Sequence, residues 1–368
     1  MLNLEGLVDV RKEFFVPGRV ELAGNHTDHQ SGRILASAVD LGLYATAVPN
    51  GGKLVRIQSE GFAPIQVDIG QLSVRPYEFG SPQALVRGMI ASFVDLGLDV
   101  GGFDAKLRST LPIGSGMSSS AAFAVLIGRI LSVFFNDDKL PPMVIARTAL
   151  NAENIFFGKP CGLMGQLACA LGHTVYADLK TGEIEHIRAD FSTMGLALTL
   201  TDTGGSHAGL DTSYARIVDD MVYIANFFDK GVLADVDEAE FRAKGWDASA
   251  RPVRRAIHFF DENKRVLKMR DALKSGNGNE YMRLMNESGR SSEKLLTNVF
   301  TSATGDTKLE EGLELSRSLL EGKGAWRVHG GGFAGCVQAL MPADYYGEYK
   351  ASMEKVFGEG KCRKVKLI

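Results

Sequence analysis

The sequence has little that would point to a secreted, membrane or nucleic-acid-binding protein. Only four of its 368 residues are cysteines, and they form no CxxC pair or metal-ligand cluster. We therefore expect reduced thiols and a cytoplasmic location. No apolar run reaches the roughly 18 residues of a membrane span, and the first residues lack the apolar core of a signal peptide, so we expect no membrane association. The formal net charge of −3 gives no general attraction to nucleic acid.

What the chain has in quantity is glycine, with 42 residues that gather in a few loops. The length suits two domains at roughly 100–200 residues each, and we place a weakly marked boundary near residue 190, giving domains 1–190 and 191–368. Hydrophobic periodicity predicts an α+β protein. Strands are expected within 14–48 and over 103–109, and a hairpin over 174–187. Helices are expected at 117–134, 141–157, 211–230, 253–274 and 278–290.

The strongest local pattern is LPIGSGMSSSAAFAVLIG, residues 111–128. Glycines let a backbone turn tightly beside a ligand, three serines follow, and a helix then begins. The first N–H groups of a helix attract an anion, and hydroxyls bind phosphate oxygens or Mg²⁺. The pattern is neither GxxxxGK[ST] nor GxGxxG. A serine-capped helix after a glycine turn is the simpler interpretation.

Two further loops carry groups that suit a ligand. PGRVELAGNHTDHQSGR, residues 17–33, gathers Arg19, Asn25, His26, Asp28 and His29 near one turn, where short polar groups can bind sugar hydroxyls or simply face solvent. No third ligand at useful spacing supports a metal there. HGGGFAG, residues 329–335, permits close approach of a backbone to a ligand, or is a flexible turn.

Glu153 lies within the apolar stripe of the helix expected at 141–157. A buried carboxylate needs a partner, which a metal ion would supply. A glutamate at the edge of the stripe is the simpler interpretation.

Together, in this order, these patterns resemble the GHMP small-molecule kinases, and within them the galactokinases. PGRVELAGNHTDHQSG is similar to the galactokinase signature PGRVN-hydrophobic-x-GEHTDY. LPIGSGMSSSAA and VHGGGFAGCVQAL are similar to the family's phosphate-binding and C-terminal glycine-rich motifs. NAENIFFGKPCGLMGQ resembles the run AEH…G-x-PCG-x-MDQ. The resemblance covers nearly the whole chain.

The resemblance implies a two-domain fold with the active site in the interdomain cleft, ATP and Mg²⁺ as cofactors, and phosphoryl transfer to the 1-hydroxyl of α-D-galactose. Arg19 would stabilise charge on the transferring phosphoryl group. The residues implied to hold phosphates are Gly114, Ser115, Gly116, Ser118, Ser119 and Ser120. Ser119 and Glu153 would bind Mg²⁺. The residues implied to contact the sugar are Asn25, His26, Asp28, Gly162, Tyr214, Gly331 and Gly332.

The chain departs from the family pattern at Asn25 and at Gly165. Asn25 replaces the glutamate of GEHTD, so an amide stands in place of a charge. Gly165, twelve residues after Glu153, falls on the catalytic aspartate of MDQ. In galactokinases that aspartate accepts or orients the proton of the sugar hydroxyl, and such help is typically worth about 10²–10⁴-fold in rate.

Three interpretations follow from the missing carboxylate. The chain is a slowed galactokinase-like enzyme or a kinase for a related sugar such as N-acetylgalactosamine. Alternatively, it is a non-catalytic sensor that binds sugar and ATP. A third interpretation is that the aspartate was deliberately replaced to trap a complex. The retained SSSAA run and Glu153 favour the enzyme.

Overall fold

The computed structural model describes residues 10–112, 116–205, 210–300 and 305–368, and the chain divides into two compact units. Unit 1 comprises Met1–Arg19, Ala38–Ile113 and Met117–Gly172. Unit 2 comprises Val20–Ser37, Gly114–Gly116 and His173–Ile368. This division differs from the expected contiguous boundary at residue 190. The reason is that two long strands, β1 (Lys12–Ala23) and β2 (Arg33–Pro49), each run from one unit into the other.

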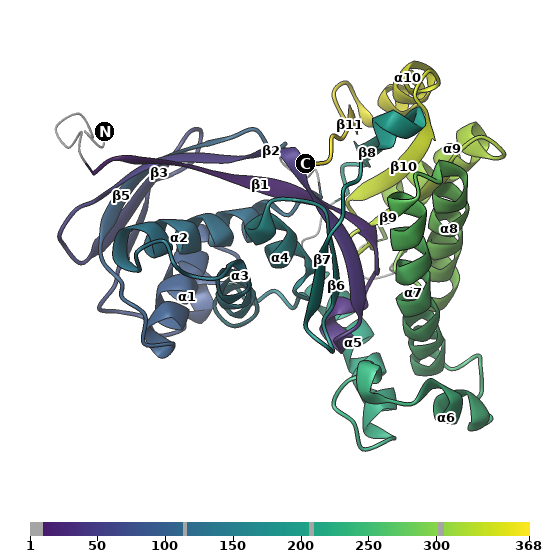
Figure 1. Ribbon diagram of the computed structural model, residues 1–368, viewed down its shortest axis with the longest axis horizontal. Coiled ribbons are helices and arrows are strands. Elements are labelled where there is room, and N and C mark those ends of the chain that lie inside the picture. Colours follow the sequence, from purple (N-terminus) through teal and green to yellow (C-terminus); the bar gives the residue numbers. More distant parts are fainter. Residues whose placement is uncertain (1–9, 113–115, 206–209, 301–304) are drawn as a thin grey trace. The chain divides into compact units, whose positions relative to one another are not determined.

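Unit 1 combines strands with a group of four helices (Figure 1). The later residues of β2 pair antiparallel with β5 (Phe103–Ser109), which pairs in parallel with β3 (Leu54–Ser59). β4 (Ile65–Asp68) completes this part of the sheet beside β3. The helices are α1 (Pro82–Asp95), α2 (Ser119–Phe135), α3 (Pro142–Asn151) and α4 (Met164–Leu171).

Local sequence explains how these helices form. Helix α1 begins after Ser81, whose side chain accepts from the backbone N–H of Ala84, and Pro82 suits the first helical position. Helix α2 is buried along most of its length, as its apolar sequence predicts. The helix expected at 141–157 is two elements: α3 ends at Asn151 and continues as a π-helical turn, η3 (Ala152–Phe156).

Unit 2 contains the predicted hairpin and a second sheet. Strand β6 (Val175–Asp178) pairs with the first residues of β2 and with β7 (Glu183–His186). The second sheet has the order β11-β8-β10-β9 and is antiparallel throughout. Its strands are β8 (Leu196–Asp202), β9 (Ala325–His329), β10 (Cys336–Pro342) and β11 (Cys362–Lys364). The helices of unit 2 are α5 (Asp211–Asn226), α6 (Glu238–Ala243), α7 (Arg251–Lys274), α8 (Gly278–Ser291), α9 (Lys308–Leu320) and α10 (Tyr346–Phe357).

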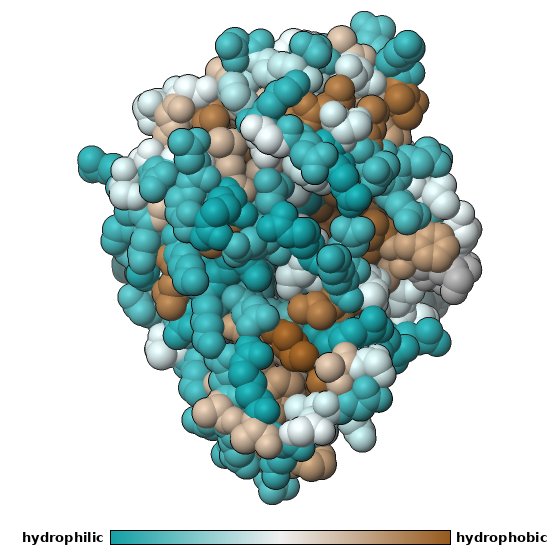
Figure 2. Space-filling view, turned by 90° about the vertical axis from the view of Figure 1, so that its right-hand side faces the viewer, coloured by the Kyte–Doolittle hydropathy of each residue, from teal (hydrophilic) through white to brown (hydrophobic). Residues whose placement is uncertain are grey.

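One apolar core of unit 2 lies between helices α5 and α7. Ile217 and Met221 of α5 are fully buried in one apolar cluster with Phe259 of α7. The face in Figure 2 is mostly hydrophilic, and hydrophobic residues occur on it in small groups. Within the described ranges, every helix is too short or too polar to cross a lipid bilayer. Mixed helices and mainly antiparallel strands confirm the α+β prediction.

Candidate active site

The serine-rich loop leads directly into α2, and the loop backbone is unusual. Ser118 is in the left-handed region, with φ 57° and ψ 54°, and its side chain makes no capping hydrogen bond to the helix. Non-glycine residues rarely adopt this conformation, and it often marks functional loops. The simpler interpretation, a serine that caps α2, is therefore wrong. The first N–H groups of α2 form the kind of helix end that binds anions.

The implied phosphate-binding residues differ in accessibility. Ser119 is exposed, whereas Ser118 and Ser120 are partly buried. Gly116 has φ 67° and falls in unit 2. Gly114 and Ser115 lie outside the described residues.

Glu153 lies on the π-helical turn η3 and is 1% exposed. Such turns are rare and occur frequently at functional sites. The hydroxyl of Ser120 donates to Glu153 Oε1 at 2.6 Å, and the Lys159 ammonium lies 3.3 Å from the same oxygen. The side-chain amide of Gln166 donates to Oε2. The carboxylate is thus surrounded by donors, and the interpretation as a stray glutamate at the stripe's edge is wrong.

Gly165, in the first turn of α4, lies beside Arg19 and Ser118. A Cβ built on Gly165 would lie 3.3 Å from Ser118 Oγ and 3.6 Å from Arg19 Nε. The rotatable hydroxyl is the tighter contact, so a small side chain fits after a minor adjustment. A carboxylate at this position would therefore lie beside the Arg19 guanidinium and the Ser118 hydroxyl.

The buried thiol of Cys169 lies near the charges of both Arg19 and Glu153. Burial raises the pKa of its thiol to about 12, while the charge of Arg19 lowers it and that of Glu153 raises it. The thiol is therefore neutral at physiological pH and serves as a packing residue rather than a nucleophile.

The loop between η3 and α4 contains Gly162 and is tied to η3 by Asn154. The Asn154 side chain accepts from the N–H of Cys161 at 2.9 Å and donates to the Cys161 carbonyl at 3.3 Å. Gly162, implied to contact the sugar, therefore lies in a fixed loop of unit 1.

The groups around Glu153 suit Mg²⁺ in one specific way. Mg²⁺ usually takes one or two protein carboxylates and completes its shell with substrate phosphates and water. The described residues hold no cluster of three or more carboxylate, imidazole or thiol ligands for a metal. Glu153 with Ser120 instead offers one carboxylate and one hydroxyl, and the neighbouring Gln166 Oε1 is buried without a hydrogen-bond partner. These oxygens fit a magnesium ion brought in by a nucleotide, and they place Ser120, rather than Ser119, next to the carboxylate.

In unit 2, His26 and His29 of the predicted sugar loop form a chain of hydrogen bonds that ends at the glycine-rich turn. His26 Nε2 lies 2.9 Å from the carbonyl of Gly331, so it donates, and His26 Nδ1 accepts from His29 Nε2 at 3.2 Å. Burial lowers the pKa of both imidazoles, and the charge of His26 further lowers that of His29. Both rings are therefore neutral near pH 7, with the tautomers that this chain requires. His26 has φ 57°, another left-handed residue in a motif loop.

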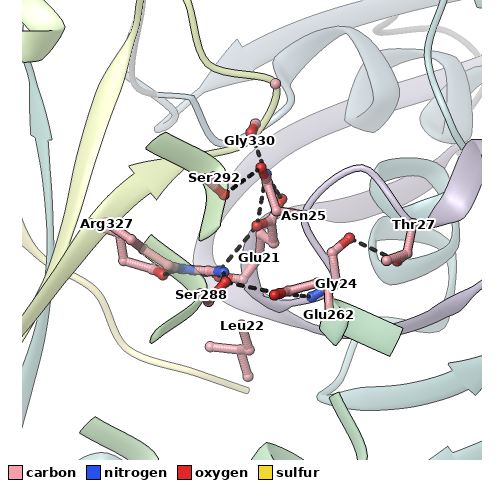
Figure 3. A network of polar contacts seen from close by, with 12 residues as sticks. Glu21, Leu22, Gly24, Asn25, Thr27, Glu262, Ser288, Ser292, Arg327 and Gly330 are labelled. Atoms are coloured by element: carbon pink, nitrogen blue, oxygen red, sulfur yellow. Dashed lines mark hydrogen bonds and ion pairs between the residues drawn. The ribbon is translucent and has the colours of Figure 1, made fainter. Parts of the chain in front are cut away.

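Asn25 is engaged on all sides by unit 2 itself (Figure 3). It is 1% exposed, and its Nδ2 donates to both oxygens of Glu21 and to the carbonyl of Gly330. Its Oδ1 accepts from Ser292 Oγ and Asn298 Nδ2, at 3.1 and 3.0 Å. This arrangement favours a role in shaping the loop over the sugar contact that the resemblance implies.

The glycine-rich turn after β9 is tightly packed against its own unit. A Cβ on Gly331 would lie 2.5 Å from the ring of Tyr214, and one on Gly332 would collide with the Asn298 carbonyl. The Tyr214 hydroxyl donates to the Gly332 carbonyl at 2.7 Å. Only glycine fits these two positions, and the interpretation as a flexible turn is wrong. Tyr214 and the turn are therefore in direct contact, and the sugar contacts that the resemblance implies for them stay a prediction.

Asp28 begins the short helix η1 (Asp28–Gln30) and is partly buried. One carboxylate oxygen accepts from the backbone N–H of His29 at 3.0 Å, and the charge of Asp28 raises the pKa of His26 against the larger effect of burial. The carboxylate thus lies near the imidazole of His26.

Sequence reasoning missed several residues that the structure brings to these sites. Lys159 and Gln166 contact Glu153, and Asn298 contacts Asn25. The motif NAENIFFGKPCGLMGQ gave a signal for Lys159 and Gln166, because both are residues of the motif itself. Asn298 is far from every motif, and no sequence pattern indicated it.

Two family models match separate parts of the chain. Residues 84–173 match the family model of the GHMP kinases N terminal domain. Residues 10–49 match that of the galactokinase galactose-binding signature.

Among solved structures, Lactococcus lactis galactokinase complexed with galactose is similar at 22% identity and a TM-score of 0.86, covering 99% of this chain and 95% of that one. Methanococcus jannaschii mevalonate kinase is similar at 16% identity and a TM-score of 0.67, covering 98% and 99%. A D-glycero-D-manno-heptose 1-phosphate kinase from Bacteriodes thetaiotaomicron is similar at 16% identity and a TM-score of 0.61, covering 97% of each chain. At these identities the solved structures show a shared fold.

Proposed function

We propose that this chain is an ATP-dependent sugar 1-kinase of the GHMP family, because residues 84–173 match the GHMP kinases N terminal domain and residues 10–49 match the galactokinase galactose-binding signature. It transfers the γ-phosphoryl group of ATP to the 1-hydroxyl of α-D-galactose. The observation that supports this most directly is the grouping of Arg19 and Ser118 around Gly165, in the same unit as buried Glu153. A cation, an anion-binding helix end and a carboxylate are the groups that phosphoryl transfer needs.

In the proposed reaction the sugar oxygen forms a bond to the γ-phosphorus while the bond from phosphorus to the bridging oxygen breaks, and ADP leaves with that oxygen. Arg19 stabilises the charge on the transferring group, and the start of α2 binds phosphate oxygens. Glu153 and Ser120 would hold Mg²⁺, which neutralises phosphate charge when bound.

Gly165 provides no group to accept the proton of the sugar hydroxyl, so in this chain the proton passes to water. We infer a turnover about 10²–10⁴-fold below that of a form with the carboxylate. Activity persists because positioning and electrostatic stabilisation supply most of the acceleration in phosphoryl transfer.

The sugar-binding part of the proposal rests on unit 2. Asp28 and the surface formed by Tyr214 with Gly331 and Gly332 offer a carboxylate and backbone groups to hydroxyls. These are the contacts by which proteins recognise a small polar ligand. The signature over residues 10–49 favours galactose, and N-acetylgalactosamine is the related acceptor to compare.

The test is ADP release with Mg-ATP and galactose by the native chain and by Gly165→Asp. We expect slow release by the native chain and a gain of about 10²–10⁴-fold in Gly165→Asp. Gly165→Ala is the matched control, because it adds the Cβ without the carboxylate and leaves the rate unchanged. Arg19→Ala in the Gly165→Asp background abolishes the gain. The proposal would be overturned if neither the native chain nor Gly165→Asp released ADP with galactose or with N-acetylgalactosamine.

A second candidate function follows from Gly165 itself. A protein that binds galactose and nucleotide without transferring phosphate would act as a sensor and would not need the carboxylate. Calorimetric binding of both ligands, with no ADP release from any variant above, would favour the sensor.

A further inference from the structure

Lys159 contacts Glu153 through both its backbone and its side chain. Its backbone N–H donates to the Glu153 carbonyl at 3.0 Å, and its ammonium lies 3.3 Å from Glu153 Oε1. The Glu153 side chain is 2% exposed, whereas that of Lys159 is 45% exposed. The carboxylate is therefore held in place, while the flexible lysine side chain has room to move away from it.

Glu153 is a buried carboxylate, and a charge in a buried place is stable only when an opposite charge or hydrogen-bond donors neutralise it. Lys159 supplies the opposite charge, and the hydroxyl of Ser120 shares the same oxygen at 2.6 Å. A divalent cation that binds Oε1 takes the position of the ammonium, because two cations cannot share one carboxylate oxygen without repulsion.

We propose that Lys159 is a resident cation that takes over part of the metal's role at Glu153. This inference rests on the proposed function, since it assumes that nucleotide phosphates bind beside Glu153. The ammonium neutralises Glu153 when no metal is present and also attracts the phosphates. Nucleotide binding therefore depends less on a divalent metal than it would with a neutral residue at position 159.

The absence of a carboxylate at residue 165 strengthens this effect. Unit 1 places Arg19 next to Gly165, and Lys159 next to Glu153, so the described site has two cations for one carboxylate. A positive site attracts a polyanion even without a metal.

The experiment measures the binding of AMP-PNP to the full chain by calorimetry, once with Mn²⁺ and once with EDTA. The ratio of the two dissociation constants, EDTA over Mn²⁺, reports the dependence on metal. We expect Lys159→Met to raise this ratio about tenfold, consistent with removal of one partly exposed charge at close range. Lys159→Arg is the matched control that keeps the charge and leaves the ratio near the native value. Melting temperatures of all variants verify that they are folded.

Glu153→Gln separates the two proposals. If Glu153 binds the metal, this variant lowers the ratio, and adding Lys159→Met then has no further effect. A lower ratio in Glu153→Gln together with an unchanged or lower ratio in Lys159→Met would overturn the role of Lys159 and leave the kinase proposal intact. Failure of the native chain to bind AMP-PNP under both conditions would overturn both proposals.

Discussion

The side-chain amide of Asn25 donates to both carboxylate oxygens of Glu21, at 3.1 and 3.3 Å. Arg327 lies 3.1 Å from Glu21 Oε1 on the other side, and all three side chains are buried. The galactokinase signature PGRVN-hydrophobic-x-GEHTDY has an asparagine at the position of Glu21 and a glutamate at the position of Asn25. This chain thus keeps one amide and one carboxylate in contact, in the opposite order, so the departure at Asn25 is matched by a second one at Glu21.

This pairing predicts energetic coupling between the two residues. Asn25→Asp places two carboxylates together in a buried site, and we expect it to lower the free energy of unfolding by about 3–5 kcal/mol. Adding Glu21→Gln restores one amide and one carboxylate. We therefore expect the double variant to be about 1–3 kcal/mol more stable than the sum of the two single-variant losses in the free energy of unfolding would give. Urea unfolding of the four proteins measures this. Purely additive effects would show that the two side chains do not depend on each other.

The sugar loop gives a second prediction. Asp28→Ala removes the carboxylate that we propose binds sugar hydroxyls, while the backbone hydrogen bond from the Ser31 N–H to the Asp28 carbonyl remains, so we expect galactose binding to weaken by about 1.5–3 kcal/mol. Binding of AMP-PNP to the same variant remains near the native value. Calorimetric titration with each ligand is the measurement.

Asp190→Ala is the matched control for Asp28→Ala. Asp190 caps another short helix of unit 2, η4 (Phe191–Met194), by accepting from the N–H of Ser192 at 2.8 Å, as Asp28 accepts from His29. We expect Asp190→Ala to leave the binding of galactose and of AMP-PNP unchanged. Equal loss of galactose and AMP-PNP binding in Asp28→Ala would mean that Asp28 is structural only.

Local patterns predicted much of this fold because they depend on near neighbours. The strand at 103–109 has the predicted bounds, and the helix predicted at 117–134 is found at Ser119–Phe135. The π-helical turn at Glu153 was missed because it forms only the last turn of the expected helix, which leaves too few following residues for a shifted hydrophobic period to be seen. The surroundings of Asn25 were missed for another reason. Its partners Ser292, Asn298 and Gly330 lie more than 260 residues away in the chain, and only tertiary structure brings them to it.

The buried histidine of α7 explains a further property, the dependence of stability on pH. Burial lowers the pKa of His258 to about 4, against smaller opposing effects of the Glu262 charge and the hydrogen bond to the Asn25 carbonyl. Nε2 donates to that carbonyl at 2.9 Å, and Nδ1 accepts from Ser291 Oγ at 2.8 Å, so the neutral ring that burial favours has a partner on both nitrogens. Glu262 stays ionised across this range because burial, which raises its pKa, is outweighed by Arg265 and other positive groups that bring it to about 2.

Because the pKa of His258 is lowered in the folded protein, the free energy of unfolding falls as the pH falls. Between pH 6.5 and about 4 the unfolded chain binds a proton at His258 that the folded protein does not, so stability is fully present above pH 6.5 and is lost as the pH falls. We expect His258 to account for a loss of about 2 kcal/mol in the free energy of unfolding between pH 8 and pH 5. His26 and His29 act in the same direction, since burial lowers their pKa values too. Urea unfolding at several pH values, compared with His258→Gln, isolates the share of His258. An identical pH dependence in the two proteins would contradict this assignment.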